Sequence, residues 1–274
     1  LVYSSLFLCA QAYRSLEQWE DAINTFRAAA EIQVERRSEA LGHIFGLYEQ
    51  LGRSTEARQV LEEALQISPE HPDHLYNAGV LYMRESNYGE AQVYFEKAKN
   101  VASDPTKALL NLGFIFKARG EFEEAENVYR EAKSVDSQSI EATVNLAHLL
   151  LDVERFTESK NTFEEVRQQH SDLLDVELGY LLALLNIPEV EWSTCKKVLF
   201  GISEKISDWE ANPSDLALPE RAGLLISELG AQLVASEMFR CAELAFVSAN
   251  KLDDSLYDGR RLLAELYIQR HAYW

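Results

Sequence analysis

Apolar residues recur along the chain with the spacing of amphipathic helices. A small residue, a large apolar residue four positions later and a small residue three positions after that form a stripe, as in Ala91, Phe95 and Ala98. Residues at i, i+4 and i+7 lie on one face of a helix, so each stripe predicts a helix that buries this face. The stripe begins again at intervals of 35, 34, 34 and 34 residues, at Ala22, Ala57, Ala91, Ala125 and Ser159.

A second apolar stripe precedes each of these. In the third repeat it consists of Leu75, Gly79 and Tyr82, and a short polar turn follows it. The turns of the second and fourth repeats carry Gly52 and Gly120. Each repeat is therefore predicted to be two antiparallel helices joined by a tight turn. Because Gly and Ala let helix backbones approach closely, we expect aromatic side chains to fill the remaining groove.

A single helix pair cannot bury its apolar face, so the pairs are expected to stack on one another. The predicted fold class is all-α, a right-handed superhelical solenoid of antiparallel helix pairs. Because the chain lacks an initiating Met and stops at Trp274 within a repeat, we expect it to be a fragment of a longer protein. The predicted boundaries are five regular units over 3–171, a degenerate sixth over 172–206, an insertion loop over 207–222, a seventh over 223–256 and the first helix of a truncated eighth over 257–274.

The repeat resembles a known family. Tyr76–Ala98 and Leu110–Ala132 both follow the order L…G/A…Y and then A…F…A within a period of 34 residues. This pattern is similar to that of the tetratricopeptide repeat family, superhelical type, and it covers about residues 3–171. The resemblance implies helix–turn–helix repeats and a concave groove that binds a peptide or a partner domain.

Three asparagines stand at the same place in successive first helices, Asn77, Asn111 and Asn145, with intervals of 34 residues. An asparagine side chain carries both a donor and an acceptor, so a row of them can pair with the backbone of an extended peptide. Superhelical members of the family carry a partial or complete asparagine ladder of this kind. In the alternative interpretation, the asparagines belong to the repeat consensus and bond neighbouring helices. The sequence leaves both interpretations open.

Other candidate residues fall on the same face of the first helices by helical spacing. Their mixture of aromatic, apolar and sparse basic side chains suits a peptide with apolar anchors. The basic members, Arg84, Lys107 and Lys117, form either a cationic spot for a carboxylate or ordinary solvated positions. The candidate peptide-binding residues are Asn77, Asn111, Asn145, Tyr76, Met83, Arg84, Lys107, Phe114, Lys117 and His148.

The charge of the chain excludes several partners. It contains 26 Lys and Arg against 45 Asp and Glu, a net charge of −19. Such a chain repels nucleic acid and anionic membrane surfaces, and favours basic partners. There is no apolar run long enough to span a membrane. Three cysteines without a paired motif indicate a reducing compartment, so we expect a cytoplasmic location.

Few residues indicate chemistry. His71 and His74 could offer metal ligands, but they lie at a repeat junction where Asp73 is placed to cap the next helix. The acidic stretch Asp253–Gly259 lacks the alternating ligands of a calcium loop and is interpreted as an inter-repeat turn. The chain contains no nucleotide-binding, zinc-protease or serine-hydrolase motif. We therefore expect no enzymatic activity, no cofactor and no metal.

The sequence predicts a non-catalytic interaction module, an adaptor that binds an extended peptide or a partner domain in its concave groove. One alternative is the targeting arm of a larger enzyme, such as a glycosyltransferase or methyltransferase, whose catalytic domain lies outside this chain. Another is a self-assembling scaffold in which copies of the chain stack through the terminal repeat near Trp274.

Overall fold

The structure is a computed structural model that describes residues 2–170, 173–188, 192–211, 230, 242 and 245–247. Within these residues all regular elements are helices, which pack as consecutive pairs, so the predicted all-α class is confirmed. The chain divides into two compact units, residues 1–137 and 138–274. Across the described ranges, every helix is too short or too polar to cross a membrane.

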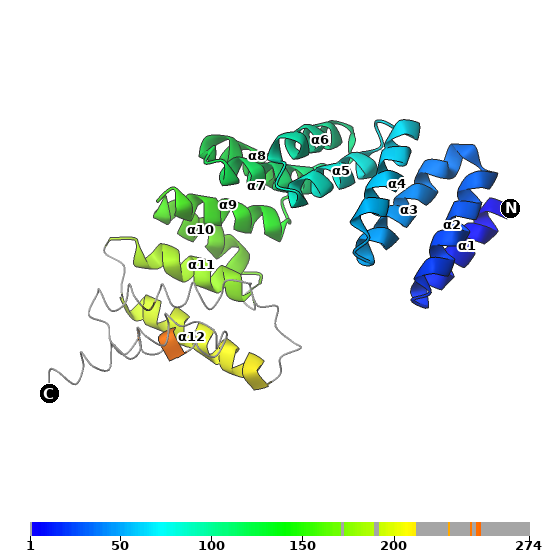
Figure 1. The fold of residues 1–274 in the computed structure, drawn as a ribbon. Coiled ribbons are helices and arrows are strands. Elements are labelled where there is room, and N and C mark those ends of the chain that lie inside the picture. Colours follow the sequence, from blue (N-terminus) through cyan, green and yellow to red (C-terminus); the bar gives the residue numbers. More distant parts are fainter. Residues whose placement is uncertain are drawn as a thin grey trace. The chain divides into compact units, whose positions relative to one another are not determined.

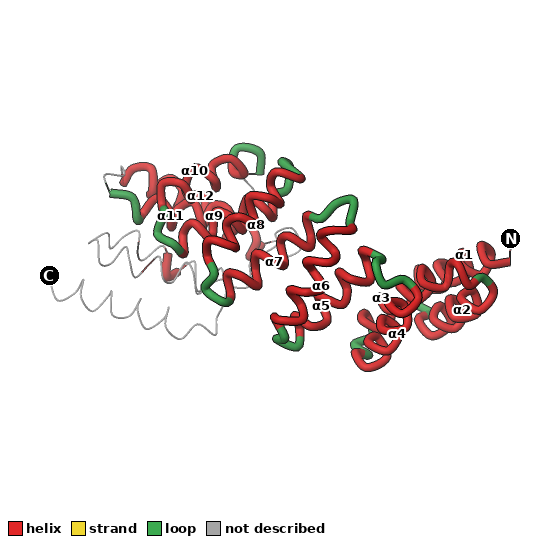
Figure 2. Tube along the Cα trace, turned by 90° about the horizontal axis from the view of Figure 1, so that it is seen from above, coloured by secondary structure: helices red, strands yellow, loops and turns green. Residues whose placement is uncertain are grey.

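The first unit contains four helix pairs and a 3-10 turn, Val34–Arg36 (Figures 1 and 2). Within each pair the two helices pack closely, and each pair also contacts the next one along the chain. The pairs are α1 (Val2–Ser15) with α2 (Trp19–Ile32), α3 (Arg37–Gln50) with α4 (Ser54–Ile67), α5 (Pro72–Arg84) with α6 (Tyr88–Val101), and α7 (Thr106–Ala118) with α8 (Phe122–Val135).

The second unit begins with the pair α9 (Ile140–Asp152) and α10 (Phe156–Arg167), followed by α11 (Leu174–Leu185) and α12 (Trp192–Ala211). Cys195, Leu199 and Ile202 on α12 are buried, as expected for the partner helix of α11. Six residues, 186–191, separate the end of α11 from the start of α12, against three in the regular pairs.

The predicted insertion loop is wrong at its beginning. It was expected from Ser207, but α12 continues to Ala211. Residues 207–211 contain no helix breaker, and the first one is Pro213, which also restricts Asn212 before it. Residues 212–222 and most of the predicted seventh and eighth units, including Trp274, lie outside the described residues. Their boundaries stay predictions.

Glycines of the first helices lie against aromatic rings of the second helices. A Cβ atom on Gly79 would lie 2.7 Å from the Phe95 ring, and one on Gly113 would lie 2.3 Å from the Tyr129 ring. Carbon atoms do not approach one another this closely, so only glycine fits. The same relation returns at Gly230, where a Cβ would lie 2.5 Å from the buried Phe246.

The serine in the stripe of small residues is accommodated by a hydrogen bond. Ser159 is fully buried on α10, where the other repeats have alanine. Its hydroxyl donates to the backbone carbonyl of Ala147 on α9, over 2.8 Å. Because the buried hydroxyl is satisfied, the helix pair keeps the same close packing.

The three-residue turns of the five regular pairs share one backbone conformation. In each turn the middle residue has a positive φ, and the residue after it donates its N–H to a carbonyl five residues earlier, as Asn87 does to Tyr82 over 2.9 Å. This is the Schellman ending of a helix, which favours glycine. The middle residues are Glu17 (φ 59°), Gly52 (69°), Ser86 (58°), Gly120 (77°) and Glu154 (61°).

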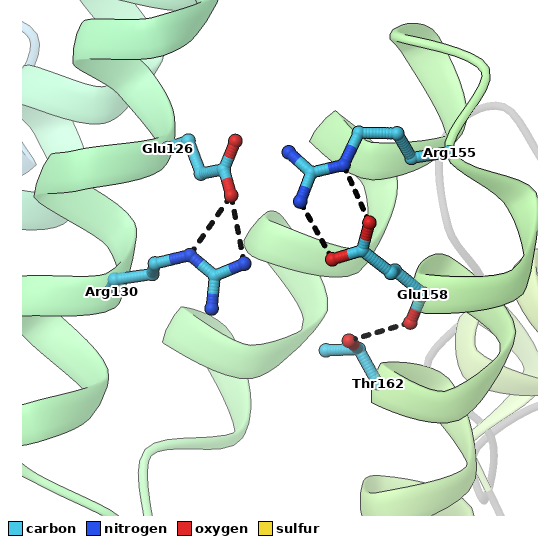
Figure 3. Close-up of polar contacts among 5 residues, drawn as sticks. All are labelled: Glu126, Arg130, Arg155, Glu158 and Thr162. Atoms are coloured by element: carbon cyan, nitrogen blue, oxygen red, sulfur yellow. Dashed lines mark hydrogen bonds and ion pairs between the residues drawn. The ribbon is translucent and has the colours of Figure 1, made fainter.

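Exposed ion pairs connect side chains one turn apart on the second helices. Figure 3 shows two of them, Arg130 with Glu126 on α8 and Arg155 with Glu158 at the start of α10. The Thr162 hydroxyl donates to the Glu158 backbone carbonyl over 2.8 Å. Solvent-exposed pairs of this kind stabilise little, so the apolar packing between the helices determines the fold.

Replacing Gly113 by alanine tests the close contact between the helices. Gly113→Ala should lower the free energy of unfolding by about 1–3 kcal/mol, because the new methyl group overlaps the Tyr129 ring. Gly46→Ala on α3 is the matched control, since nothing lies within 4 Å of its Cβ position. It should be neutral or raise stability by up to about 1 kcal/mol. Urea unfolding measures both, and equal effects would contradict this account.

Replacing Ser86 by glycine tests the backbone conformation of the turn. Ser86→Gly should raise the free energy of unfolding by about 1 kcal/mol, because a residue with a Cβ is strained at a φ of 58°. Gly120→Ala, at the same place in the next turn, should change it by a similar amount in the opposite direction. The urea midpoints of the two variants measure this difference. Two shifts of the same sign would show that the turns are not equivalent.

Candidate functional site

Most of the candidate residues lie on two neighbouring first helices of the first unit. Helix α5 carries Tyr76, Asn77, Met83 and Arg84, and α7 carries Lys107, Asn111, Phe114 and Lys117. The remaining two, Asn145 and His148, lie on α9 in the second unit and are described with that unit.

A pocket of about 450 Å³ opens beside α3, α5 and α7 in the first unit. Three of the predicted residues, Tyr76, Asn77 and Lys107, line it. The pocket lies at the N-terminal halves of three successive first helices, so the regular stacking of the pairs forms it. Its other lining residues are Glu39, Gly42, His43, His71, Pro72, Asp73, His74, Ala98, Ala102, Asp104 and Ala108.

Asn111 joins the two helices that carry the candidate residues. Its Nδ2 group donates one hydrogen bond to the Tyr76 hydroxyl on α5, over 3.3 Å, and one to the Lys107 backbone carbonyl, over 2.9 Å. The first bond is the kind that the alternative interpretation of the asparagines expects. Since both amide hydrogens are used, only Oδ1 remains for a ligand, as an acceptor.

Aromatic side chains continue this face along α5 and α7. Phe114 is 48% exposed, and its ring meets the edge of Tyr88 at a centroid distance of 6.5 Å. The centroid of the Tyr76 ring lies 5.6 Å from that of the Phe95 ring in the core, so packing against this buried ring fixes its position. Met83 is half-buried on α5. These side chains offer apolar area beside the polar pocket.

Of the two interpretations left open for the basic residues, the contacts of Arg84 and Lys107 do not favour a cationic spot. The Arg84 guanidinium makes an ion pair with Glu49 on α3, so its charge is compensated within the protein. Lys107 shares the pocket with three carboxylates, those of Glu39, Asp73 and Asp104. Helical spacing places residues on a face, but it does not show which acidic side chains of the neighbouring repeat reach them.

Histidines form the inner wall of the pocket. His74 is only 2% exposed, and its Nε2 atom lies 2.7 Å from the Ser38 hydroxyl on α3. Its Cε1 atom would lie 3.1 Å from a Cβ on Gly42, another pocket residue. The His71 ring stacks on it at a centroid distance of 4.2 Å. The Nδ1 atoms of both rings are buried without a hydrogen-bond partner among the described residues.

Burial keeps two of these rings neutral. It lowers the pKa of His74 to about 4, and the nearby His71 acts in the same direction. Burial also lowers the pKa of His43, with a further contribution from the charge of Arg14. At neutral pH neither ring adds positive charge to the pocket, and each retains one nitrogen lone pair as an acceptor.

The arrangement of His71 and His74 does not suit a shared metal ion. The two rings stack with only 25° between their planes, whereas a metal must lie in the plane of each ligating ring, close to its nitrogen. Across the described residues there is no group of three or more His, Cys, Asp or Glu that could hold a metal. Asp73 also differs from expectation, because the N-cap of α5 is His71 and Asp73 lies in the first turn.

Sequence reasoning missed the contribution of α3 to the pocket. Glu39, Gly42 and His43 were not among the candidates, although His43 occupies the place of the asparagines in its repeat. Glu39 accepts hydrogen bonds from the Arg36 guanidinium over 2.8 and 3.0 Å. The repeat places His43 at the asparagine position, but the sequence alone does not show that it lines a pocket.

In the second unit, His148 and a buried glutamate are held by neighbouring helices. The His148 Nε2 atom lies 3.0 Å from the Asp175 carboxylate on α11. Glu177, at the place of the asparagines, is 5% exposed and accepts hydrogen bonds from Arg167 over 3.0 Å and Lys205 over 3.4 Å. Asn145 is half-buried on α9. On α11 a glutamate held by two basic side chains therefore takes the place of the amide, whereas α9 keeps Asn145.

Sequence comparison identifies the family. Models of the tetratricopeptide repeat match residues 8–72, 47–108 and 108–141. This chain is a tetratricopeptide repeat protein. The matched residues include the helices that form the pocket, and the matched repeats have the helix–turn–helix structure described above. No curated protein matches this tetratricopeptide repeat protein in sequence.

Solved structures share the fold. A tetratricopeptide repeat protein from Parabacteroides merdae is 15% identical, with a TM-score of 0.63 over 97% of this chain and 98% of the other. PilW, a type IV pilus biogenesis factor, is 19% identical, with a TM-score of 0.62 over 82% and 99%. Pseudomonas aeruginosa pilF is 19% identical, with a TM-score of 0.62 over 84% and 98%. At these identities the likeness concerns the fold alone.

The buried His74 gives this tetratricopeptide repeat protein a specific dependence of stability on pH. Its pKa is about 4 in the folded protein against 6.5 ordinarily, so only the unfolded chain binds a proton between these values. This protonation leaves the free energy of unfolding unchanged above pH 6.5, and lowers it by up to about 3 kcal/mol as the pH falls to 4. Urea unfolding at pH 7 and pH 5 should show a smaller decrease for His74→Gln than for the wild type. Parallel decreases would contradict the assignment.

Proposed function

We propose that the chain is a non-catalytic interaction module, and that the first helices of its first unit bind an extended peptide segment of a partner protein. The observation that carries the proposal is the pocket beside α3, α5 and α7, together with the exposed Phe114 further along α7. A polar pocket next to apolar side chains can hold both the backbone and the side chains of an extended peptide.

Asn77 and Asn111 are the residues proposed to contact the peptide backbone. Asn77 lines the pocket and makes no hydrogen bond through its side chain to another described residue, so its donor and acceptor are both available. Asn111 offers its carbonyl oxygen, because its amide hydrogens bond to Tyr76 and Lys107. The proposed contacts in this unit are therefore one complete amide and one acceptor.

Two other functions stay open as proposals. The chain could serve as the recognition arm of a larger enzyme, and the same groove would then bind the substrate of that enzyme. Self-assembly through Trp274 involves a residue outside the described part of the chain. The predicted cytoplasmic location also stays a prediction.

The proposal is tested with peptides selected from a random library of about 12 residues on the wild-type chain. Asn111→Ala should weaken the selected peptides about fivefold, since a hydrogen bond of this kind contributes about 1 kcal/mol. Isothermal titration calorimetry measures the affinity. Asn100→Ala, an exposed asparagine on α6, is the matched control and should leave the affinity unchanged.

A second variant separates binding from support of the helices. Tyr76→Phe removes the hydrogen bond between α5 and α7 but leaves the Asn111 carbonyl in place. It should weaken the peptide less than Asn111→Ala does. Equal losses of affinity would mean that Asn111 contributes only through its hydrogen bond to Tyr76. Selected peptides that bind elsewhere, as shown by unchanged amide resonances on α5 and α7, would overturn the proposed function.

A further inference from the structure

The pocket beside α3, α5 and α7 has a charge and hydrogen-bonding character that indicates what it binds. Four charged side chains line it: Glu39, Asp73 and Asp104 against Lys107. Glu39 is already paired with Arg36, so two carboxylates remain against one ammonium group. The pocket therefore has an excess of negative charge, like the chain as a whole, whose net charge is −19.

The two remaining carboxylates lie near the N-terminal ends of helices, whose partial positive charge would otherwise attract an anion. The Asp104 carboxylate accepts a hydrogen bond from the Thr106 backbone N–H over 3.0 Å. Hydrogen bonding to Thr106, side chain and backbone together, holds the pKa of this carboxyl below its usual range. Asp73 lies in the first turn of α5. The helix ends are thus occupied by the protein's own acidic groups, and an anionic ligand would have to compete with them.

The histidines add no positive charge to the pocket. His43 and His74 are neutral at pH 7 because burial lowers the pKa of each. His74 is the second, independent indication of a ligand site, since it is 2% exposed, lines the pocket and has an Nδ1 atom without a partner among the described residues. The Nδ1–Cε1 edge of this ring faces Gly42, which also lines the pocket.

We propose that this pocket takes the side chain of an arginine from the bound peptide. A guanidinium group offers five N–H donors in one plane, which suits a wall that carries two unpaired carboxylates and the amide oxygen of Asn77. It also stacks on aromatic faces, and the Tyr76 ring lines the pocket. A volume of about 450 Å³ is sufficient for one long side chain and the water around it.

The inference rests on the proposed function for the longer peptide, but its test uses a short probe. The blocked tripeptide Gly-Arg-Gly is titrated into the isotope-labelled full chain at pH 7, and amide resonances are followed by NMR. The same tripeptides with citrulline, lysine and glutamate are the comparisons. Citrulline has nearly the shape of arginine without its charge.

The arginine tripeptide should shift the resonances of pocket residues such as Gly42 and Asn77, with a dissociation constant of about 1 mM. Lysine should bind more weakly because it has fewer donors. Citrulline and glutamate should bind at least about tenfold more weakly. Equal binding of citrulline, tighter binding of glutamate, or shifts confined to residues outside the pocket would each overturn the proposal.

Two variants with opposite expected effects on the affinity distinguish a specific loss of binding from misfolding. Asp73→Asn with Asp104→Asn should weaken the arginine tripeptide about tenfold, and the amide oxygen introduced at position 104 can still accept the Thr106 N–H. Lys107→Gln should strengthen it about threefold, because a competing cation is removed. Glu123→Gln, an exposed charge on α8 away from the pocket, should have no effect. A Lys107→Gln variant that binds more weakly would contradict the charge argument.

The outcomes also separate this inference from the proposed function. If the arginine tripeptide binds in the pocket but no library peptide binds the face of α5 and α7, the arginine pocket stands and the extended-peptide function fails. If library peptides bind that face without any preference for arginine, the function stands and the arginine pocket is wrong.

Discussion

In the pairs α5–α6 and α7–α8 the helices lie close together because the first helix presents a glycine to an aromatic ring sixteen residues later in the chain. Gly79 with Phe95 and Gly113 with Tyr129 leave no space for even one additional carbon atom. A contact of this kind fixes both the distance between the helices and their relative rotation. The same pair at Gly230 and Phe246 shows that the constraint extends into the second unit.

The position of the candidate site follows from that contact. Since Gly79 faces the partner helix, Asn77, two residues earlier, lies on the opposite side of α5. The same reasoning places Asn111 on the opposite side of α7 from Gly113. Polar residues of successive first helices are thus brought to one face by residues that never touch a ligand. The pocket arises where this face meets the connection between α6 and α7, which supplies Ala102 and Asp104.

The repeat, the pairing of the helices and the buried stripes could be predicted from the sequence because they depend on periodicity. The row of Asn77 and Asn111 could be found for the same reason. What could not be predicted depends on contacts between repeats. Arg84 pairs with Glu49 and Asn111 donates to Tyr76, and both contacts join residues about 35 positions apart in the chain.

The other differences between the sequence predictions and the structure depend on the surroundings of particular residues. The helical end of α12 was missed because polar residues from Ser207 onward are typical of a loop, although nothing among them breaks a helix before Pro213. The histidine wall required a third helix, α3, whose Ser38 fixes the ring of His74. A sequence shows that His71 and His74 are near each other, but it does not show that their rings stack rather than converge.

The turn residues have a consequence for local dynamics. Residues other than glycine hold the left-handed conformation at Glu17, Ser86 and Glu154, and glycine holds it at Gly52 and Gly120. Strained and relaxed turns therefore alternate from one helix pair to the next. The pair α5–α6, which contributes more residues to the pocket than any other, has a strained turn between two neighbours with relaxed ones. Local opening that starts at this pair would loosen the pocket while the pairs on either side remain folded.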